Sequence, residues 1–145
     1  MTKLDIRPLT LADMDAVLDV YERTIPFAYQ CDGLSDKIEA IEEEIQSKKI
    51  MVHDALLNER SAIEFLIASI DGKVIGSIST GPSGKEIIEC TKGRLKDVIE
   101  LGSLYVLPEY QGRGIGTALI QAVANRLAER GIEFFCLDSG YRHAQ

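Results

Sequence analysis

The sequence predicts a mixed α/β fold, in which four antiparallel strands are followed by a helix and a fifth, parallel strand. Three observations predict it. Short apolar runs indicate strands, two longer segments carry apolar residues at helical spacing, and a glycine-rich turn joins an extended run to a helix in the last third of the chain. With 145 residues, 46% of them hydrophobic, the chain can bury a core as one domain spanning residues 1–145.

The N-terminal segment is predicted to form a short strand and then a helix. Residues 4–6 alternate between apolar and charged side chains, and Pro8 fixes the end of this strand. Thr10 and Asp13 form a loose capping box, so a helix is expected to begin at Thr10. Its apolar residues recur at helical spacing up to Pro26, which is expected to end or kink the helix.

A second helix is predicted after Ser35, whose hydroxyl can cap it, and it is expected to end near Lys49. Residues 50–62 are ambiguous apart from a helical turn around residues 55–58. One face of the helix is dense in glutamate. The opposite face carries an apolar stripe, which consists of Ile38, Ile41 and Ile45.

Two strands are predicted over Glu64–Ile70 and Lys73–Thr80, because both segments are short and apolar. The pair Asp71-Gly72 between them is a strong signal for a two-residue hairpin, so these strands are expected to be antiparallel. Residues 81–96 are polar and contain glycines. We expect a long loop there, which either selects a substrate or is a plain surface excursion.

The next predicted strand, Val98–Val106, is interrupted by Gly102, which marks a bulge or a close backbone approach. The helix that follows is expected to be capped by Gly131. Residues 132–137 are nearly all apolar and predict a strand covered on both faces, joined to the preceding strand by a right-handed parallel crossover. The core stripe of the intervening helix consists of Ile115, Leu119, Val123 and Leu127.

The turn between that strand and helix contains three alternating glycines, Gly112, Gly114 and Gly116. Glycine is needed where the backbone takes a positive φ or approaches a ligand closely. The first turn of a helix also presents unpaired N–H groups at the positive end of the helix dipole. Together these features predict a cradle for a phosphate or pyrophosphate, to which Arg113 can add a charge-assisted contact.

The lettering of this turn resembles one known family. Gln111-x-x-Gly114-x-Gly116 is similar to the Q/R-x-x-G-x-G/A signature of the GNAT superfamily of acyl-CoA-dependent N-acyltransferases, and it follows a strand that ends Leu-Tyr-Val-Leu-Pro-Glu-Tyr. The similarity spans nearly the whole chain and is most specific from Glu100 to Leu127.

This resemblance implies acetyl-CoA as a co-substrate, with its pyrophosphate on the glycine turn and its pantetheine arm paired along the strand before it. A backbone N–H of that strand is then the expected donor to the thioester oxygen as it becomes an oxyanion. The cofactor-binding residues so implied are Leu104, Tyr105, Val106, Gln111, Gly112, Arg113, Gly114, Ile115, Gly116 and Thr117.

The same resemblance implies transfer of the acetyl group to a primary amine by direct attack on the thioester. Because such an amine is mostly protonated at neutral pH, a base should accept its proton, and Glu100 occupies the matching position. Period-two geometry puts Glu100 on the face of Gly102 and Leu104, unless a bulge at Gly102 changes the register. Tyr141 is the candidate proton donor to the departing thiolate, and Tyr105 and Tyr110 are alternatives.

Members of this family continue beyond the fifth strand with a helix and further strands. A chain that ends at Gln145 would leave the edge of that strand uncovered, which favours strand exchange. We therefore expect either a truncated chain lacking its C-terminal portion or a homodimer in which a second subunit completes the sheet.

Composition limits the partners. The net charge of −7 argues against a nucleic-acid partner, which requires a basic face, and mildly favours a cationic acceptor. No signal peptide or apolar run of membrane-spanning length appears, so we expect a cytoplasmic protein with no membrane partner. Cys31, Cys90 and Cys136 form no disulfide framework, and with His53 and His143 they match no zinc pattern, so no metal is expected.

Other readings of the glycine turn remain. A dinucleotide enzyme would require G-x-G-x-x-G and repeated βαβ units, and a P-loop would require GxxxxGK[ST]; neither pattern is present. A non-catalytic acyl-CoA-binding or regulatory module would keep the cradle without the chemistry. A small-molecule amine, an amino acid, a polyamine, an antibiotic or a peptide N-terminus all remain open as the acceptor.

Overall fold

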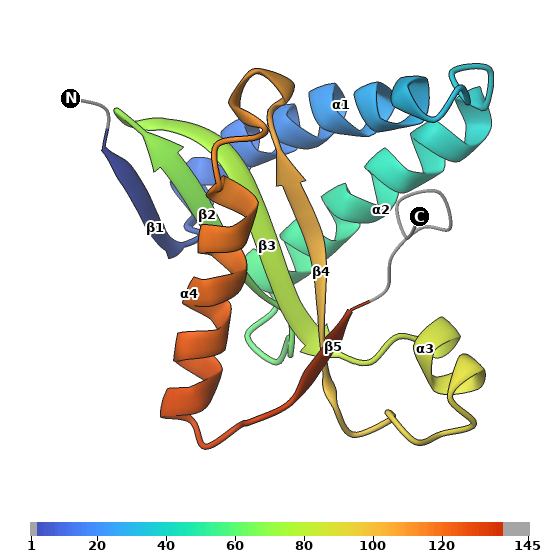
Figure 1. The fold of residues 1–145 in the computed structure, drawn as a ribbon, viewed down its shortest axis with the longest axis vertical. Helices are drawn as coiled ribbons and strands as arrows, with labels where there is room; N and C mark the ends of the chain where they lie inside the picture. The colour runs from blue at the N-terminus through green and yellow to red at the C-terminus, as the bar shows by residue number, and fades with distance from the viewer. Residues whose placement is uncertain (1–2, 138–145) are drawn as a thin grey trace.

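A five-stranded sheet lies between two layers of helices in the part of the chain, residues 3–137, that the computed structural model describes (Figure 1). The strand order is β1-β2-β3-β4-β5, with antiparallel pairing up to β4 and parallel pairing of β4 with β5. The predicted mixed α/β fold is therefore confirmed. The strands are β1 (Leu4–Pro8), β2 (Glu64–Ile70), β3 (Lys73–Pro82), β4 (Ile99–Val106) and β5 (Phe135–Leu137).

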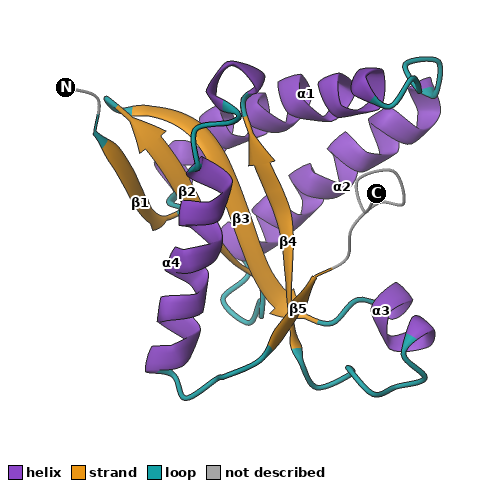
Figure 2. Cartoon of the chain, viewed as in Figure 1, coloured by secondary structure: helices purple, strands orange, loops and turns teal. Residues whose placement is uncertain are grey.

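Helices cover both faces of this sheet. Figure 2 shows α1 and α2 behind the strands and α4 in front of them, while α3 lies to the side of the end of β3. Two short 3-10 turns, η1 and η2, precede α1 and the glycine turn respectively. The helical elements are η1 (Leu11–Asp13), α1 (Met14–Cys31), α2 (Ile38–Leu57), α3 (Lys85–Cys90), η2 (Pro108–Tyr110) and α4 (Ile115–Glu129).

The core forms where β2 and β3 pass between the two helical layers. Consecutive residues of β3 face opposite layers: a side chain at Gly76 would meet Leu119 of α4, whereas Ser77 contacts Tyr21 of α1. Burial of apolar side chains from all three layers is the main stabilising contribution. The largest fully buried apolar residues are Tyr21, Ile25, Ile67, Ile75, Ile78, Leu107 and Leu119.

The hairpin between β2 and β3 is confirmed. Asp71 and Gly72 take φ angles of 51° and 82°, so both turn residues lie in the left-handed region, as a type I′ turn requires. Ile70 pairs with Lys73 across the turn, and the ladder continues to Glu64 opposite Thr80. The local signal was sufficient here because the turn residues themselves set the register.

The first helix does not end at Pro26, and the predicted end of the second helix near Lys49 is wrong. α1 continues past Pro26 to Cys31, since Ile25 is fully buried and Tyr29 packs against the same core beyond the proline. α2 begins at Ile38 after Lys37, without a cap from Ser35, and runs to Leu57 instead of ending near Lys49. Its second half is held by Val52, which is completely buried, so tertiary packing extends the helix through the ambiguous segment.

Two predictions in the second half also need correction. The predicted loop over residues 81–96 contains α3, a helix of six residues. β5 begins at Phe135, three residues later than predicted, because Ile132 belongs to the cap of α4. The Ile132 N–H donates to the Leu127 carbonyl at 2.9 Å, and the N–H of Gly131, whose φ is 76°, donates to the Ala128 carbonyl at 3.0 Å. These are the two hydrogen bonds of a Schellman motif.

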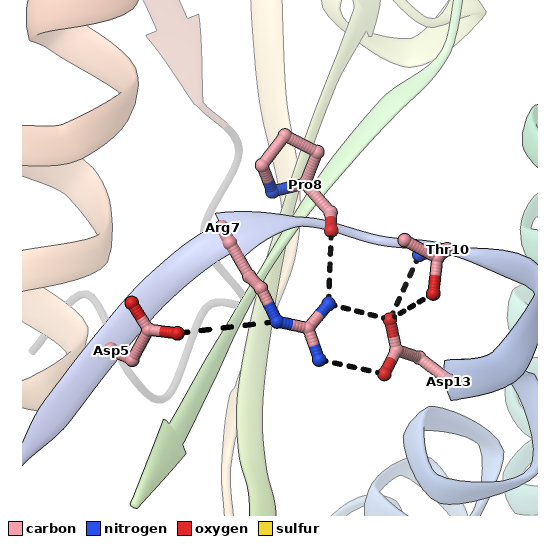
Figure 3. Close-up of polar contacts among 5 residues, drawn as sticks. All are labelled: Asp5, Arg7, Pro8, Thr10 and Asp13. Atoms are coloured by element: carbon pink, nitrogen blue, oxygen red, sulfur yellow. Dashed lines mark hydrogen bonds and ion pairs between the residues drawn. The ribbon is translucent and has the colours of Figure 1, made fainter. Parts of the chain in front are cut away.

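A buried carboxylate joins β1 to the start of α1 (Figure 3). Asp13 is only 8% exposed and accepts two hydrogen bonds from the Arg7 guanidinium, at 2.7 and 2.9 Å. The backbone N–H and the hydroxyl of Thr10 donate to the same carboxylate at 2.9 and 2.7 Å, so the predicted capping pair is confirmed. These hydrogen bonds, with Arg7 the largest contributor, hold the pKa of Asp13 well below its ordinary value.

Replacing this carboxylate should make the protein less stable in a pH-dependent way. We expect Asp13→Asn to lower the free energy of unfolding at pH 7 by about 1–2 kcal/mol, because a charge-assisted pair is lost but Arg7 is partly solvated. A depressed pKa stabilises the fold above the unfolded value of about 3.9, so the difference should shrink as the pH falls below 4. Urea unfolding at pH 7 and pH 3 measures both.

The matched control is Asp5→Asn. Asp5 lies 4.0 Å from Arg7, but its side chain is 59% exposed, so its loss should change the free energy of unfolding by less than about 0.5 kcal/mol. Equal effects of the two substitutions at pH 7 would contradict the central role of Asp13.

Candidate active site

The glycine turn leads directly into the N-terminus of α4. Gly112 and Gly114 have φ angles of 77° and 81°, and Gly114 is the residue that precedes the helix. The first hydrogen bond of the helix runs from the Ala118 N–H to the Gly114 carbonyl at 3.0 Å. The three preceding amides, residues 115–117, therefore have no acceptor within the helix and point toward the turn. This arrangement suits an anion.

Space in front of this turn is open. A Cβ atom added at Gly112, Gly114 or Gly116 would meet no atom within 4 Å. The first two glycines are explained by their positive φ, but Gly116 has neither a positive φ nor a close neighbour. Its missing side chain is thus not required by the fold itself, and it leaves the backbone accessible to a molecule from outside.

Gln111 and Arg113 take different positions around the turn. The Gln111 side-chain amide donates to the Val106 carbonyl at 2.9 Å, and so ties the turn to the end of β4. The Arg113 guanidinium lies 5.2 Å from the centre of the Tyr110 ring, whose other neighbour is the Lys73 ammonium at 5.7 Å. Gln111 therefore fixes the position of the cradle relative to β4, while Arg113 remains exposed beside it.

β4 contains the bulge that Gly102 predicted, and the bulge begins one residue after that glycine, at Ser103. Ser77 pairs with Tyr105 and Ser79 pairs with Gly102, so the two residues 103 and 104 lie opposite Ile78 alone. Ser103 has a φ of 50°, which is strained for a residue other than glycine. The bulge changes which side chains share a face of the strand. Tyr105, and not Leu104, lies on the same face as Glu100 and Gly102.

The side of β4 that faces β5 is paired only at its start. The parallel ladder joins Ile99 to Phe135, Glu100 to Cys136 and Leu101 to Leu137. Beyond Leu101, no residue of the described part of the chain pairs with this side of β4. Figure 1 shows β5 at one end of β4 only, and Leu104 is 41% exposed. The predicted pantetheine strand, residues 104–106, thus has a free edge within residues 3–137.

Glu100 lies near the start of β4, where β5 pairs with it, and is half-buried. Its carboxylate accepts a hydrogen bond from the Gly84 N–H at 2.7 Å, which anchors the segment before α3. A Cβ atom at Gly84 would lie 3.2 Å from the carboxylate oxygen, so glycine permits this close contact. One carboxylate oxygen is therefore fixed, and the other accepts no hydrogen bond from residues 3–137.

A group of polar side chains lies over the same face of β4. The Glu44 carboxylate of α2 accepts hydrogen bonds from the Tyr105 hydroxyl at 2.7 Å and from the Tyr29 hydroxyl at 3.2 Å. The Lys48 ammonium, one helical turn later, lies 5.8 Å from the centre of the Tyr105 ring. We refer to Tyr29, Glu44, Lys48 and Tyr105 as the Glu44 cluster.

Burial controls the titration of this cluster. Desolvation, reinforced by the charge of Glu44, raises the pKa of Tyr105 and of Tyr29, so both hydroxyls remain protonated donors. Desolvation also lowers the pKa of Lys48, although Glu44 and Glu100 act in the opposite direction. The sequence analysis missed Tyr29, Glu44 and Lys48, and it named Tyr105 for its backbone and as an alternative proton donor. The available signal was the i, i+4 spacing of Glu44 and Lys48 on one helix.

Several other expectations concern features outside this region. Tyr141, the candidate proton donor, lies outside the described residues. Cys31, Cys90 and Cys136 are unpaired, and within residues 3–137 no group of three His, Cys, Asp or Glu side chains could hold a metal ion. No described helix is long and apolar enough to cross a membrane.

A cavity of about 230 Å³ lies near the C-terminal end of α4, lined by Arg126 among others, away from the glycine turn.

Comparison with known proteins places this geometry in a family. The model of the acetyltransferase (GNAT) family matches residues 17–144. The chain belongs to the GNAT acetyltransferase family. It is 29% identical over 131 residues to acetyltransferase plu1384 of Photorhabdus laumondii, a match that covers 88% of this chain and 69% of that protein.

Solved structures agree. A GNAT family acetyltransferase of Brucella melitensis, crystallised with acetyl-CoA, is 27% identical, with a TM-score of 0.63 over 98% of this chain and 80% of the other. The PaiA N-acetyltransferase of Thermoplasma acidophilum, solved with coenzyme A, has a TM-score of 0.65 at 24% identity, over 90% of this chain and 75% of that one. At that identity the second likeness concerns the fold. As a GNAT member, the chain is an acyl-CoA-dependent acetyltransferase.

The bulge in β4 predicts an unusual stabilising substitution. Ser103 combines a left-handed backbone with a side-chain oxygen that is buried without a hydrogen-bond partner among the described residues. We expect Ser103→Gly to raise the free energy of unfolding by about 1 kcal/mol, because both penalties disappear and exceed the entropy that glycine adds to the unfolded chain. Urea unfolding measures the change.

Ser79→Gly is the control, since Ser79 is equally buried on the neighbouring strand, and its φ is not positive. It should lower the free energy of unfolding by about 0.5–1 kcal/mol. A loss of stability in Ser103→Gly of the same size would show that the bulge carries no strain.

Proposed function

We propose that this GNAT acetyltransferase transfers the acetyl group of acetyl-CoA to a primary amine by direct attack of the amine on the thioester. The observation that supports it most is the continuity of two features. The free amides at the start of α4 lie one short turn away from the edge of β4 that stays unpaired within residues 3–137, and Gln111 holds the two together. An extended anionic cofactor can be bound by both at once.

The described residues fit such a coenzyme. The open space before Gly112, Gly114 and Gly116 and the amides of residues 115–117 suit a diphosphate, with Arg113 beside them. Residues 104–106 offer backbone groups to the pantetheine arm and a donor to the thioester oxygen. Bound acetyl-CoA supplies the carbonyl carbon that the amine attacks. The cofactor-binding residues in this proposal are those predicted from the sequence.

Glu100 is proposed as the base that accepts the amine proton. Its carboxylate is half-buried near the start of β4, on the face that Gly102 leaves open, and the Gly84 amide orients it. Tyr141 stays the proposed donor to the departing thiolate.

The acceptor in this proposal is a small-molecule or peptide amine, and a homodimer remains a proposed assembly. The unpaired cysteines support a reducing, cytoplasmic location.

The cradle is tested by comparing the two ends of α4. Gly114→Ala and Gly131→Ala each place a side chain at a positive φ, of 81° and 76°, without a steric clash, so both should cost about 1 kcal/mol of stability. Only Gly114→Ala is expected to weaken coenzyme A binding, by about tenfold or more, equivalent to about 1.4 kcal/mol. Isothermal titration with coenzyme A measures it, and equal affinities in both variants would refute the cradle.

The base is tested through the pH dependence of acetyl transfer. We expect Glu100→Gln to reduce kcat/KM by about 100-fold at pH 7 while leaving coenzyme A affinity unchanged. The deficit should narrow as the pH approaches 10, because the acceptor amine then loses its proton to solvent. Thiol release over a panel of primary amines gives the profile. Glu89→Gln is the control, because the Glu89 side chain on α3 is exposed.

Two outcomes would count against this function. An unchanged pH profile in Glu100→Gln would remove Glu100 from the mechanism. Tight binding of acetyl-CoA without thiol release on any amine, in the unaltered protein, would favour the non-catalytic module instead.

A further inference from the structure

Lys48 is a half-buried cation that has no close oxygen partner in the part of the chain that the structure describes. Among the described residues its only hydrogen-bond contact is the weak one to the Met51 sulfur at 4.0 Å, and no carboxylate lies within ion-pair distance of it. Its neighbour Lys49, by contrast, pairs with Glu22 at 2.9 Å. An ammonium in such a position loses hydration without full compensation, which favours the neutral amine.

The surroundings of Lys48 come from three elements. Glu44 lies one turn earlier on α2, Glu100 and Tyr105 are on β4, and Tyr29 of α1 reaches Glu44. The two carboxylates raise the pKa of Lys48, but burial has the larger effect, so the net shift of the pKa is downward. A larger fraction of this amine is therefore neutral at a given pH than for an exposed lysine.

The Lys48 ammonium also lies over the ring of Tyr105, on the strand β4 that is proposed to bind the pantetheine arm. It interacts with both Glu100 and Tyr105, and the bulge puts these two on one face with Gly102 between them. Among residues 3–137, a side chain at Gly102 would contact only the Ser79 hydroxyl, at 3.5 Å, so these residues leave this part of β4 uncovered. Lys48 thus combines the three properties that an acetyl acceptor needs: an amine, a base nearby, and a place over the face of β4 that carries Glu100, Gly102 and Tyr105. We call this face the acceptor face.

We propose that Lys48 is itself an acetyl acceptor, so that the protein acetylates its own chain. The inference rests on the proposed function. The Nζ lone pair forms a bond to the thioester carbonyl carbon, and the carbon–sulfur bond breaks. The proton lost by the amine passes to Glu100, and the departing coenzyme A thiolate takes a proton from its proposed donor, Tyr141. Proton exchange with solvent restores both groups, which leaves Nε-acetyllysine and free thiol. No oxidant or further reactant is needed.

The experiment incubates the full chain with acetyl-CoA in the absence of any other amine and follows acetylation by peptide mass spectrometry. We expect Lys48 to be acetylated at least about tenfold faster than Lys49, in line with general base assistance. Lys48→Arg should abolish this fast event, and Lys49→Arg should leave it unchanged. Glu100→Gln should slow it at neutral pH.

A measurement without the coenzyme tests the amine separately. Acetylation of Lys48 by N-acetylimidazole should depend on pH with a lower midpoint than that of a free lysine side chain in a short peptide. Glu100→Gln should not slow this chemical reaction as it slows the reaction with acetyl-CoA. Equal midpoints would remove the physical basis of the proposal.

The outcomes separate the two levels of inference. If added amines are acetylated but Lys48 is not, the self-acetylation proposal alone is overturned. If coenzyme A fails to bind, the proposed function falls and this inference falls with it. Acetylation spread equally over Lys48 and the exposed lysines would show non-enzymatic chemistry and would also overturn it.

Discussion

The hydrogen bond from the Ser77 hydroxyl to the Ser103 carbonyl, at 2.9 Å, holds the feature on which the site depends. Ser77 is completely buried, and its single proton is used there, so the Tyr21 hydroxyl donates to its oxygen at 2.8 Å. This chain of two hydrogen bonds fixes the β4 bulge from the side of α1. Because a bulge adds one residue to a strand, every side chain after it changes face.

That change of face brings the helical layer and the cofactor strand together. Tyr105 turns toward α1 and α2, where its ring meets Tyr21 at 5.2 Å and its hydroxyl reaches Glu44. Leu104 turns outward and is 41% exposed. Without the extra residue, Leu104 would occupy the face of Glu100, and the Glu44 cluster would lose its contact with β4. The same bulge therefore serves both the cofactor edge and the acceptor face.

Sequence predictions succeeded where the cause is local and failed where it is distant. Asp71-Gly72 and Gly131 were predicted correctly, since a positive φ at a turn or a helix end depends on the residue itself. The end of α2 was predicted wrongly, because Val52 becomes helical through its burial against the rest of the core. Glu44 and Lys48 looked like part of a solvated helix face until α2 was placed beside Tyr105.

The sequence by itself determined the family, the mixed sheet and the glycine turn before α4, because these follow from short-range patterns and backbone preferences that each segment carries alone. Only the tertiary structure decided that Gln111 holds the end of β4, that Glu100 is bound to Gly84, and that Lys48 lies over the open face of the strand. These contacts join residues on separate elements, and their energies depend on distance, burial and orientation, which exist only once the layers have packed.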